Sequence, residues 1–156
     1  DKEFIELGSE LKLLEIYLSL EKLRFRDDFE YEIISNTGND ILVPPMLIQP
    51  FIENSLVHGL IHKEGLKKLK ITFHLDEILT CVIEDNGIGR QASKKIQQRQ
   101  NPEHESFAIS AIKNRLEILS ERFEDQIGFV YEDLLIDNVP AGTRVKIKIP
   151  IQKSEF

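Results

Sequence analysis

The apolar run Leu79–Ile83, followed at once by the acidic, glycine-containing stretch Glu84–Gly89, is the sequence feature that most restricts the fold. The run alternates too little to form a surface strand, so it predicts a buried strand. The stretch that follows predicts a turn in which Asp85 is a buried acceptor, suited to an exocyclic amine. Its glycines, Gly87 and Gly89, allow a flat or charged ligand to approach the backbone. A plain hairpin turn is the alternative, because glycines often follow strands.

The spacing of apolar residues predicts alternating helices and strands along the chain. A mixed order of this kind favours a mixed sheet covered by helices on one face, which is a two-layer α/β sandwich. The predicted strands are 29–34, 69–75, 79–84, 127–132 and 143–149, and the predicted helices are 9–25, 44–60, 90–98 and 108–123.

The first predicted helix is amphipathic and carries two apolar stripes. One contains Leu7, Leu11, Leu14 and Leu18, and the other contains Leu13, Tyr17 and Leu20. A helix that is apolar over so wide a face packs against more than one neighbour. Because the helical pattern is already under way where the sequence starts, we expect the chain to be a piece of a longer protein.

The helix predicted at 44–60 is expected to begin at Pro44-Pro45, because proline is tolerated in a first helical turn. At 100° per residue, Asn54 and His58 share one face, and Gly59 falls on the other. An amide oxygen such as that of Asn54 can ligate Mg²⁺, which prefers oxygen ligands. The alternative is that Asn54 only makes hydrogen bonds within the helix. His58 and His62 lack a third ligand at motif spacing, so they do not predict a zinc site.

Composition excludes several classes of function. The formal net charge of −7 argues against a surface for nucleic acid or anionic membrane. The single Cys81 lies inside an apolar run and has no partner, which fits a reducing compartment. The sequence has no 18-residue apolar stretch and no signal peptide.

Taken together and in order, these motifs resemble the ATP-binding domain of sensor histidine kinases, and most closely the LytS-like branch. The wider superfamily also includes DNA gyrase and MutL, and its fold is the two-layer α/β sandwich known as the Bergerat ATP-binding fold. The resemblance covers nearly the whole chain. It is carried by Glu10–Phe25, by PPMLIQPFIENSLVHG at 44–59, by DNGIG at 85–89, by NRLEIL at 114–119 and by Gly142-Thr143.

The resemblance implies that ATP and Mg²⁺ are the ligands. Residues 1–26 would be the end of a dimerisation and phosphotransfer helix, and residues 27–156 would be the catalytic domain. Asn54 would bind the Mg²⁺ that bridges the triphosphate, with Glu53 beside it and His58 on the nucleotide side of the same helix.

The other end of the implied site holds the base. Asp85 would accept a hydrogen bond from the adenine amine, assisted by Thr143 through water. Gly87 and Gly89 would bring the backbone close to the base and the sugar.

The chain departs from the family pattern at two places. Family members carry Lys or Arg three residues after the motif Asn, to bind phosphates, and this chain has Val57 there. The second glycine box falls on Ser106 to Ile109, where Ser106 and Ala108 stand in place of glycines. The ATP lid would be the loop 100–105. These departures leave open an alternative, a nucleotide-independent pseudokinase that serves as a dimerisation and signalling module.

The function implied by the resemblance is that of a protein-histidine kinase acting in a two-component system. None of the four histidines stands in a phosphoacceptor motif, so the chain would supply nucleotide but not autophosphorylate alone. The whole protein would be a membrane sensor with this part in the cytoplasm, homodimeric through the N-terminal helix, and it would phosphorylate a response regulator. A superfamily ATPase unrelated to signalling is the third interpretation.

Overall fold

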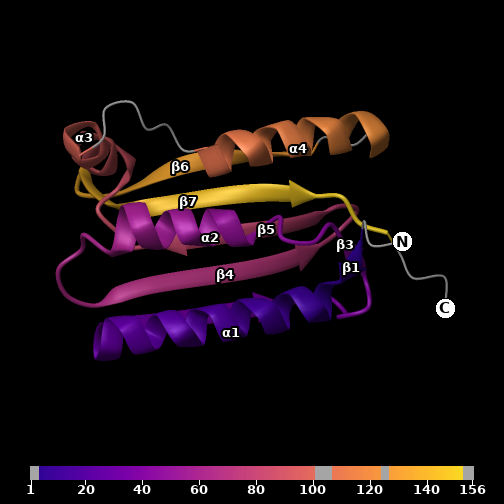
Figure 1. Ribbon diagram of the computed structural model, residues 1–156, viewed down its shortest axis with the longest axis horizontal. Coiled ribbons are helices and arrows are strands. Elements are labelled where there is room, and N and C mark those ends of the chain that lie inside the picture. The colour runs from indigo at the N-terminus through magenta and orange to yellow at the C-terminus, as the bar shows by residue number, and fades with distance from the viewer. Residues whose placement is uncertain (1–3, 101–106, 124–126, 153–156) are drawn as a thin grey trace.

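Five strands form one mixed sheet in the order β2-β4-β5-β7-β6, and helices lie over one of its faces (Figure 1). The computed structural model describes residues 4–100, 107–123 and 127–152. β2 is parallel to β4, and the other neighbouring pairs are antiparallel. The predicted two-layer α/β fold is therefore confirmed. The strands are β2 (Phe29–Ser35), β4 (Lys67–Leu75), β5 (Leu79–Asp85), β6 (Gly128–Ile136) and β7 (Val139–Ile149).

Within the part of the chain that the structure describes, four α-helices and several short elements complete the fold. A separate two-stranded ladder, which the sequence did not reveal, pairs β1 (Ile5–Glu6) with β3 (Leu42–Val43). In the described ranges, no helix is both long and apolar enough to cross a membrane. The helices are α1 (Leu7–Phe25), α2 (Gln49–Asn54), α3 (Arg90–Gln100) and α4 (Phe107–Phe123), and a 3₁₀ turn (Arg26–Asp28) follows α1.

The core lies between the sheet and the helices. Alternate residues of β5, from Leu79 to Asp85, are buried, as expected for a strand with one face toward the helices. The apolar side chains on that face pack with Leu14 and Leu18 of α1, with Ile52 of α2 and with Ile112 of α4 in one cluster. Because α1 shares this core, it is an integral layer of the domain; the functional division at residue 26 stays a prediction.

The helix expected from Pro44 begins later, at Gln49, so the predicted start was wrong. Met46 has a positive φ of 59°, which is incompatible with a helix that runs through it. Pro50, and not Pro44 or Pro45, is the proline in the first helical turn, where its missing N–H costs no hydrogen bond.

After Asn54 the helix widens into a π-helical segment, η2 (Ser55–Leu60). Here the N–H of Ile61 donates to the carbonyl of Leu56, five residues earlier, at 2.9 Å. A wider turn advances each residue by a smaller angle, which brings Gly59 round toward the side of Asn54. The sequence prediction that Gly59 lies on the opposite face assumed a regular α-helix and was wrong. Such π segments are frequent at functional sites.

β6 and β7 form a hairpin that is longer than the sequence predicted. Its turn is Asp137-Asn138, and both residues have positive φ, 51° and 62°. This is the geometry of a type I′ turn, which Asp and Asn tolerate better than most residues do. The hairpin therefore extends beyond the predicted strands 127–132 and 143–149. α3 likewise extends two residues past the predicted end at 98.

Candidate functional site

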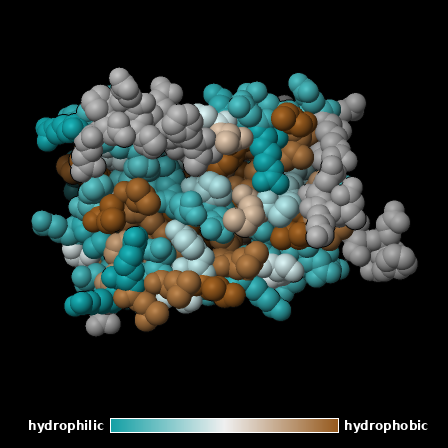
Figure 2. Space-filling model, viewed as in Figure 1, coloured by the Kyte–Doolittle hydropathy of each residue, from teal (hydrophilic) through white to brown (hydrophobic). Residues whose placement is uncertain are grey.

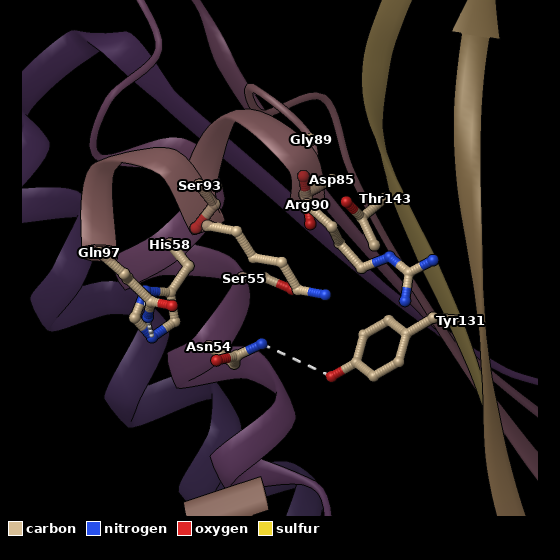
Figure 3. A pocket seen from close by; sticks show the side chains of 12 residues that line it. Asn54, Ser55, His58, Asp85, Gly89, Arg90, Ser93, Gln97, Tyr131 and Thr143 are labelled. Atoms are coloured by element: carbon tan, nitrogen blue, oxygen red, sulfur yellow. Dashed lines mark hydrogen bonds between the residues drawn. The ribbon is translucent and has the colours of Figure 1, made fainter. Parts of the chain in front are cut away.

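A pocket of about 220 Å³ opens between η2, α3, the end of β5 and the middle of β6 and β7 (Figure 3). In Figure 3, Asp85 and Thr143 lie at one end of the pocket and Asn54 and His58 at the other. The lining residues are Asn54, Ser55, His58, Gly59, Asp85, Gly89, Arg90, Ser93, Lys94, Gln97, Tyr131 and Thr143.

Most of the residues singled out in the sequence meet in this pocket. The helix that carries Asn54 and His58 and the turn that begins at Asp85 line the same cavity, although they are distant in sequence. Gly89 and Thr143 line it as well, whereas Gly87 sits just behind the lining. Of the predicted lid, residues 101–105 and Ser106 lie outside the described residues, and Ala108 belongs to α4.

Asp85 is a buried carboxylate with only 5% of its surface exposed. Burial raises its pKa to about 6, and hydrogen bonds from the N–H of Gly87, the hydroxyl of Ser55 and the N–H of Thr143 partly oppose that rise. The Gly87 N–H donates to Oδ1 at 2.9 Å. A carboxylate offers about four acceptor positions. These three donors leave one for a donor in the pocket.

The turn after β5 packs directly on η2. A Cβ built on Gly87 would lie 2.5 Å from the carbonyl carbon of Gly59, which leaves no room for a side chain. The N–H of Ile88 also donates to the Gly59 carbonyl at 3.2 Å. Gly87 is therefore required for backbone contact with η2, and this contact holds Asp85 beside the helix that carries Asn54. Gly89, with a φ of 88°, then turns the chain into α3.

The side chains at the other end of the pocket are held by neighbours. The Nδ2 of Asn54 donates to the Tyr131 hydroxyl at 3.5 Å, so the Asn54 oxygen is left to accept or to ligate. The Nε2 of Gln97 lies 2.7 Å from Nδ1 of His58, a hydrogen bond that ties α3 to η2. Because α3 and β6 orient these side chains, their arrangement does not depend on η2 alone.

Several lining residues were not found by the sequence analysis. Tyr131 enters from β6, and its position depends on strand pairing, so no local signal marks it. Four others come from α3, which was interpreted only as a polar helix. Counted from the first of them, the other three lie three, four and seven residues further along α3. This spacing places all four on one helix face and was visible in the sequence. They are Arg90, Ser93, Lys94 and Gln97.

Comparison with known proteins gives relatives along almost the whole chain. The sensor protein LytS of Staphylococcus haemolyticus is 32% identical over 149 residues, which are 94% of this chain and 25% of LytS. The sensor histidine kinase/phosphatase LytS of Staphylococcus aureus is 28% identical over 156 residues, 97% of this chain and 26% of that protein. No family model matches. The chain is a relative of the C-terminal region of LytS-type sensor histidine kinases.

Solved structures of histidine kinase catalytic domains share the fold of this chain. The histidine kinase domain of the Erythrobacter litoralis blue-light activated kinase aligns with a TM-score of 0.61 at 17% identity, covering 96% of this chain and 69% of that one. The catalytic domain of histidine kinase ThkA aligns with a TM-score of 0.59 at 14% identity, covering 95% of this chain and 97% of that one. The predicted resemblance to the histidine kinase catalytic domain is therefore confirmed.

The match is to part of each LytS-type relative. The chain spans about a quarter of the staphylococcal proteins and half of YwpD, an uncharacterized protein of Bacillus subtilis that is 29% identical over 154 residues. The staphylococcal relatives are sensor kinases, and the fold is that of solved histidine kinase catalytic domains. Neither finding favours the pseudokinase alternative.

Proposed function

We propose that this chain is the ATP-binding catalytic domain of a two-component sensor histidine kinase, and that it holds ATP in the pocket between η2 and α3. The observation that carries the proposal is that Asp85 and Asn54 line opposite ends of one pocket. The base would lie against Asp85 and Gly89, with Thr143 assisting through water and Gly87 supporting the turn from behind. The phosphates would extend toward Asn54 and His58.

The residues at the phosphate end fit a Mg²⁺ ion that arrives with the nucleotide. Asn54 offers an amide oxygen, because its nitrogen is turned toward Tyr131. Among the described residues there is no group of three His, Cys, Asp or Glu side chains that would hold a metal alone. Mg²⁺ retains water readily and is usually bound through few protein ligands plus phosphate. Bound there, it would offset the charge of the phosphoryl group being transferred.

The phosphoryl acceptor would be a histidine in a segment other than this chain, because the four histidines here stand in no acceptor motif. This chain would then contribute nucleotide binding and orientation, the main requirements of phosphoryl transfer. In the whole protein, the partner receiving the phosphoryl group from that histidine would be a response regulator. The domain would lie on the cytoplasmic side of a membrane sensor.

The titration of Asp85 gives a pH dependence for base recognition. The pKa of about 6 means that Asp85 becomes protonated as the pH falls below 6, and the acid then offers a proton where the adenine amine needs an acceptor. We expect adenosine affinity to fall by up to about tenfold per pH unit below that pKa and to be constant above it. Calorimetry in a pH series checks this, with adenosine used because it has no phosphate to titrate. A flat profile would contradict it.

α1 carries an apolar stripe that the rest of the domain leaves uncovered. Leu13, Ile16, Leu20 and Leu23 are 47%, 59%, 60% and 76% exposed, and their spacing of three, four and three residues is that of a coiled-coil seam. Figure 2 shows brown side chains along the lower edge, where α1 lies in Figure 1. The second stripe predicted from the sequence, at Leu13, Tyr17 and Leu20, is thus exposed at both leucines.

We propose that this stripe pairs with the same stripe of a second copy, as in a helical bundle. Changing Leu20 and Leu23 to glutamate should convert a dimer to a monomer without unfolding, because neither side chain is in the core. Light scattering coupled to gel filtration measures this. Lys22→Glu provides the control, because it makes the same change in net charge on α1 outside the stripe. A wild-type chain that stays monomeric at high concentration would contradict the pairing.

Calorimetric titration with Mg-ATP, with Mg-GTP as the control, tests the proposed function. GTP presents a carbonyl where ATP presents the amine, so a carboxylate at Asp85 should repel it. We expect saturable binding of ATP and none of GTP. Absence of ATP binding would favour the nucleotide-independent module, whereas turnover of ATP without a protein acceptor would favour an ATPase unrelated to signalling.

A further inference from the structure

Helix α3 forms one wall of the pocket and brings two positive charges to it. Arg90, Ser93, Lys94 and Gln97 lie on one face of the helix and line the pocket beside Asn54. The family pattern expects a cation from the opposite wall, at the position of Val57. That side chain is 48% exposed and is not part of the pocket lining.

Arg90 is already engaged by the protein. Its guanidinium donates to both carboxylate oxygens of Asp133, at 2.8 and 3.0 Å, and lies over the ring of Tyr131 at 5.1 Å from the ring centre. A bidentate pair of this kind fixes the group in place and offsets its charge. Arg90 therefore serves mainly to join α3 to β6.

Lys94 is in a different position. It lines the pocket one helical turn beyond Arg90, and no hydrogen bond or ion pair joins it to any residue in the described part of the chain. Its charge still helps to lower the pKa of the Asp133 carboxyl, which places it near the Arg90 pair without a contact of its own. Since Arg90 offsets Asp133, the charge of Lys94 is not balanced by a direct partner.

We propose that Lys94 binds the phosphates of the nucleotide and supplies from α3 the positive charge that Val57 does not supply from η2. A lysine ammonium acts on phosphate as a point charge with three donors, so it does not need the fixed geometry of the missing residue. The inference rests on the proposed function, since it names the residue that meets the phosphates in that pocket. Its consequence is that phosphate binding depends on α3 being docked on η2.

The Gln97–His58 hydrogen bond supports this arrangement. At 2.7 Å it clamps α3 to η2 one turn beyond Lys94, while the Arg90–Asp133 pair holds the helix one turn before it. Lys94 thus projects from a stretch of α3 that is fixed on both sides. Its backbone is held at the pocket before any nucleotide arrives, which reduces the entropy lost on binding.

The test compares Lys94→Ala with Lys95→Ala, using Mg-ATP and adenosine as two probes in calorimetry. Lys95 is exposed on the same helix and does not line the pocket, so it gives the same change of net charge outside the site. We expect Lys94→Ala to weaken Mg-ATP by about 10- to 100-fold, the scale of one charged hydrogen bond, and to leave adenosine unchanged. Lys95→Ala should change neither.

A second variant separates charge from structure. Adding Val57→Lys to the Lys94→Ala chain should recover most of the Mg-ATP affinity, because it returns a cation to the family position. If the wild-type chain binds both probes and Lys94→Ala keeps its Mg-ATP affinity, or loses adenosine to the same extent, the role of Lys94 is overturned and the proposed function stands. If the wild-type chain binds neither probe, both are overturned.

Discussion

Replacing Asp85 with asparagine is expected to weaken adenosine and Mg-ATP alike by about 10- to 100-fold, the value of a hydrogen bond to a charged acceptor. The carboxylate is buried at the end of the pocket, where an adenine amine would lose its water on binding. In the variant, one of the two acceptor oxygens of residue 85 becomes an NH₂ group. This group is itself a donor, so it cannot accept a hydrogen bond from the adenine amine. Calorimetry with both ligands measures the loss, and equal affinity in wild type and variant would contradict the assignment.

Unfolding of this variant is not expected to account for that loss. Because the folded-state pKa of Asp85, about 6, is above its ordinary value of 3.8, its contribution to the unfolding free energy falls as the pH rises between these values. Above pH 6 the buried charge therefore costs stability, and the neutral amide does not carry that cost. Urea unfolding at neutral pH should show that Asp85→Asn lowers the unfolding free energy by less than about 1 kcal/mol.

Replacing Gly87 with alanine is expected to destabilise the domain by at least about 3 kcal/mol and to remove nucleotide binding with it. The added Cβ would lie 2.5 Å from the carbonyl carbon and 2.7 Å from the oxygen of Gly59. Both are backbone atoms, so the strain cannot be relieved by turning a side chain. The turn after β5 and η2 would have to separate, and this would break the contact that holds Asp85 near Asn54.

Gly128 offers a matched control, since a Cβ there would meet nothing within 4 Å. Gly128→Ala should change the unfolding free energy by less than about 0.5 kcal/mol. Chemical unfolding of the wild type, Gly87→Ala and Gly128→Ala measures the difference in unfolding free energy. If Gly87→Ala were as stable as Gly128→Ala, the close packing of the turn after β5 on η2 would be contradicted.

The sequence was sufficient for the strands and most helices because their patterns are local. β5 and the alternating end of β7 bury one face each, and this alternation is visible in the residues themselves. What it did not reveal depends on backbone geometry. The widening of η2 and the positive φ of Met46 are features of the backbone that the spacing of apolar residues does not encode, so the start of the helix and the place of Gly59 were predicted wrongly.

The candidate site was predictable to the extent that its residues lie in motifs. Asp85, Asn54, His58 and Gly89 were expected together and line one pocket. Tyr131 and Lys94 were not expected, because their roles follow from tertiary placement. Tyr131 reaches Asn54 only because β6 pairs at the sheet edge beside β7.

Nuclear magnetic resonance of the ¹⁵N-labelled chain, titrated first with adenosine and then with Mg-ATP, tests the central claim most directly. We predict that adenosine shifts the backbone amides of Asp85, Gly87 and Thr143, and that Mg-ATP shifts these and also the amides of Asn54 and His58. Shifts confined to the opposite face of the sheet, around Lys70 and Glu84, would contradict the claim that one nucleotide joins the two ends of this pocket.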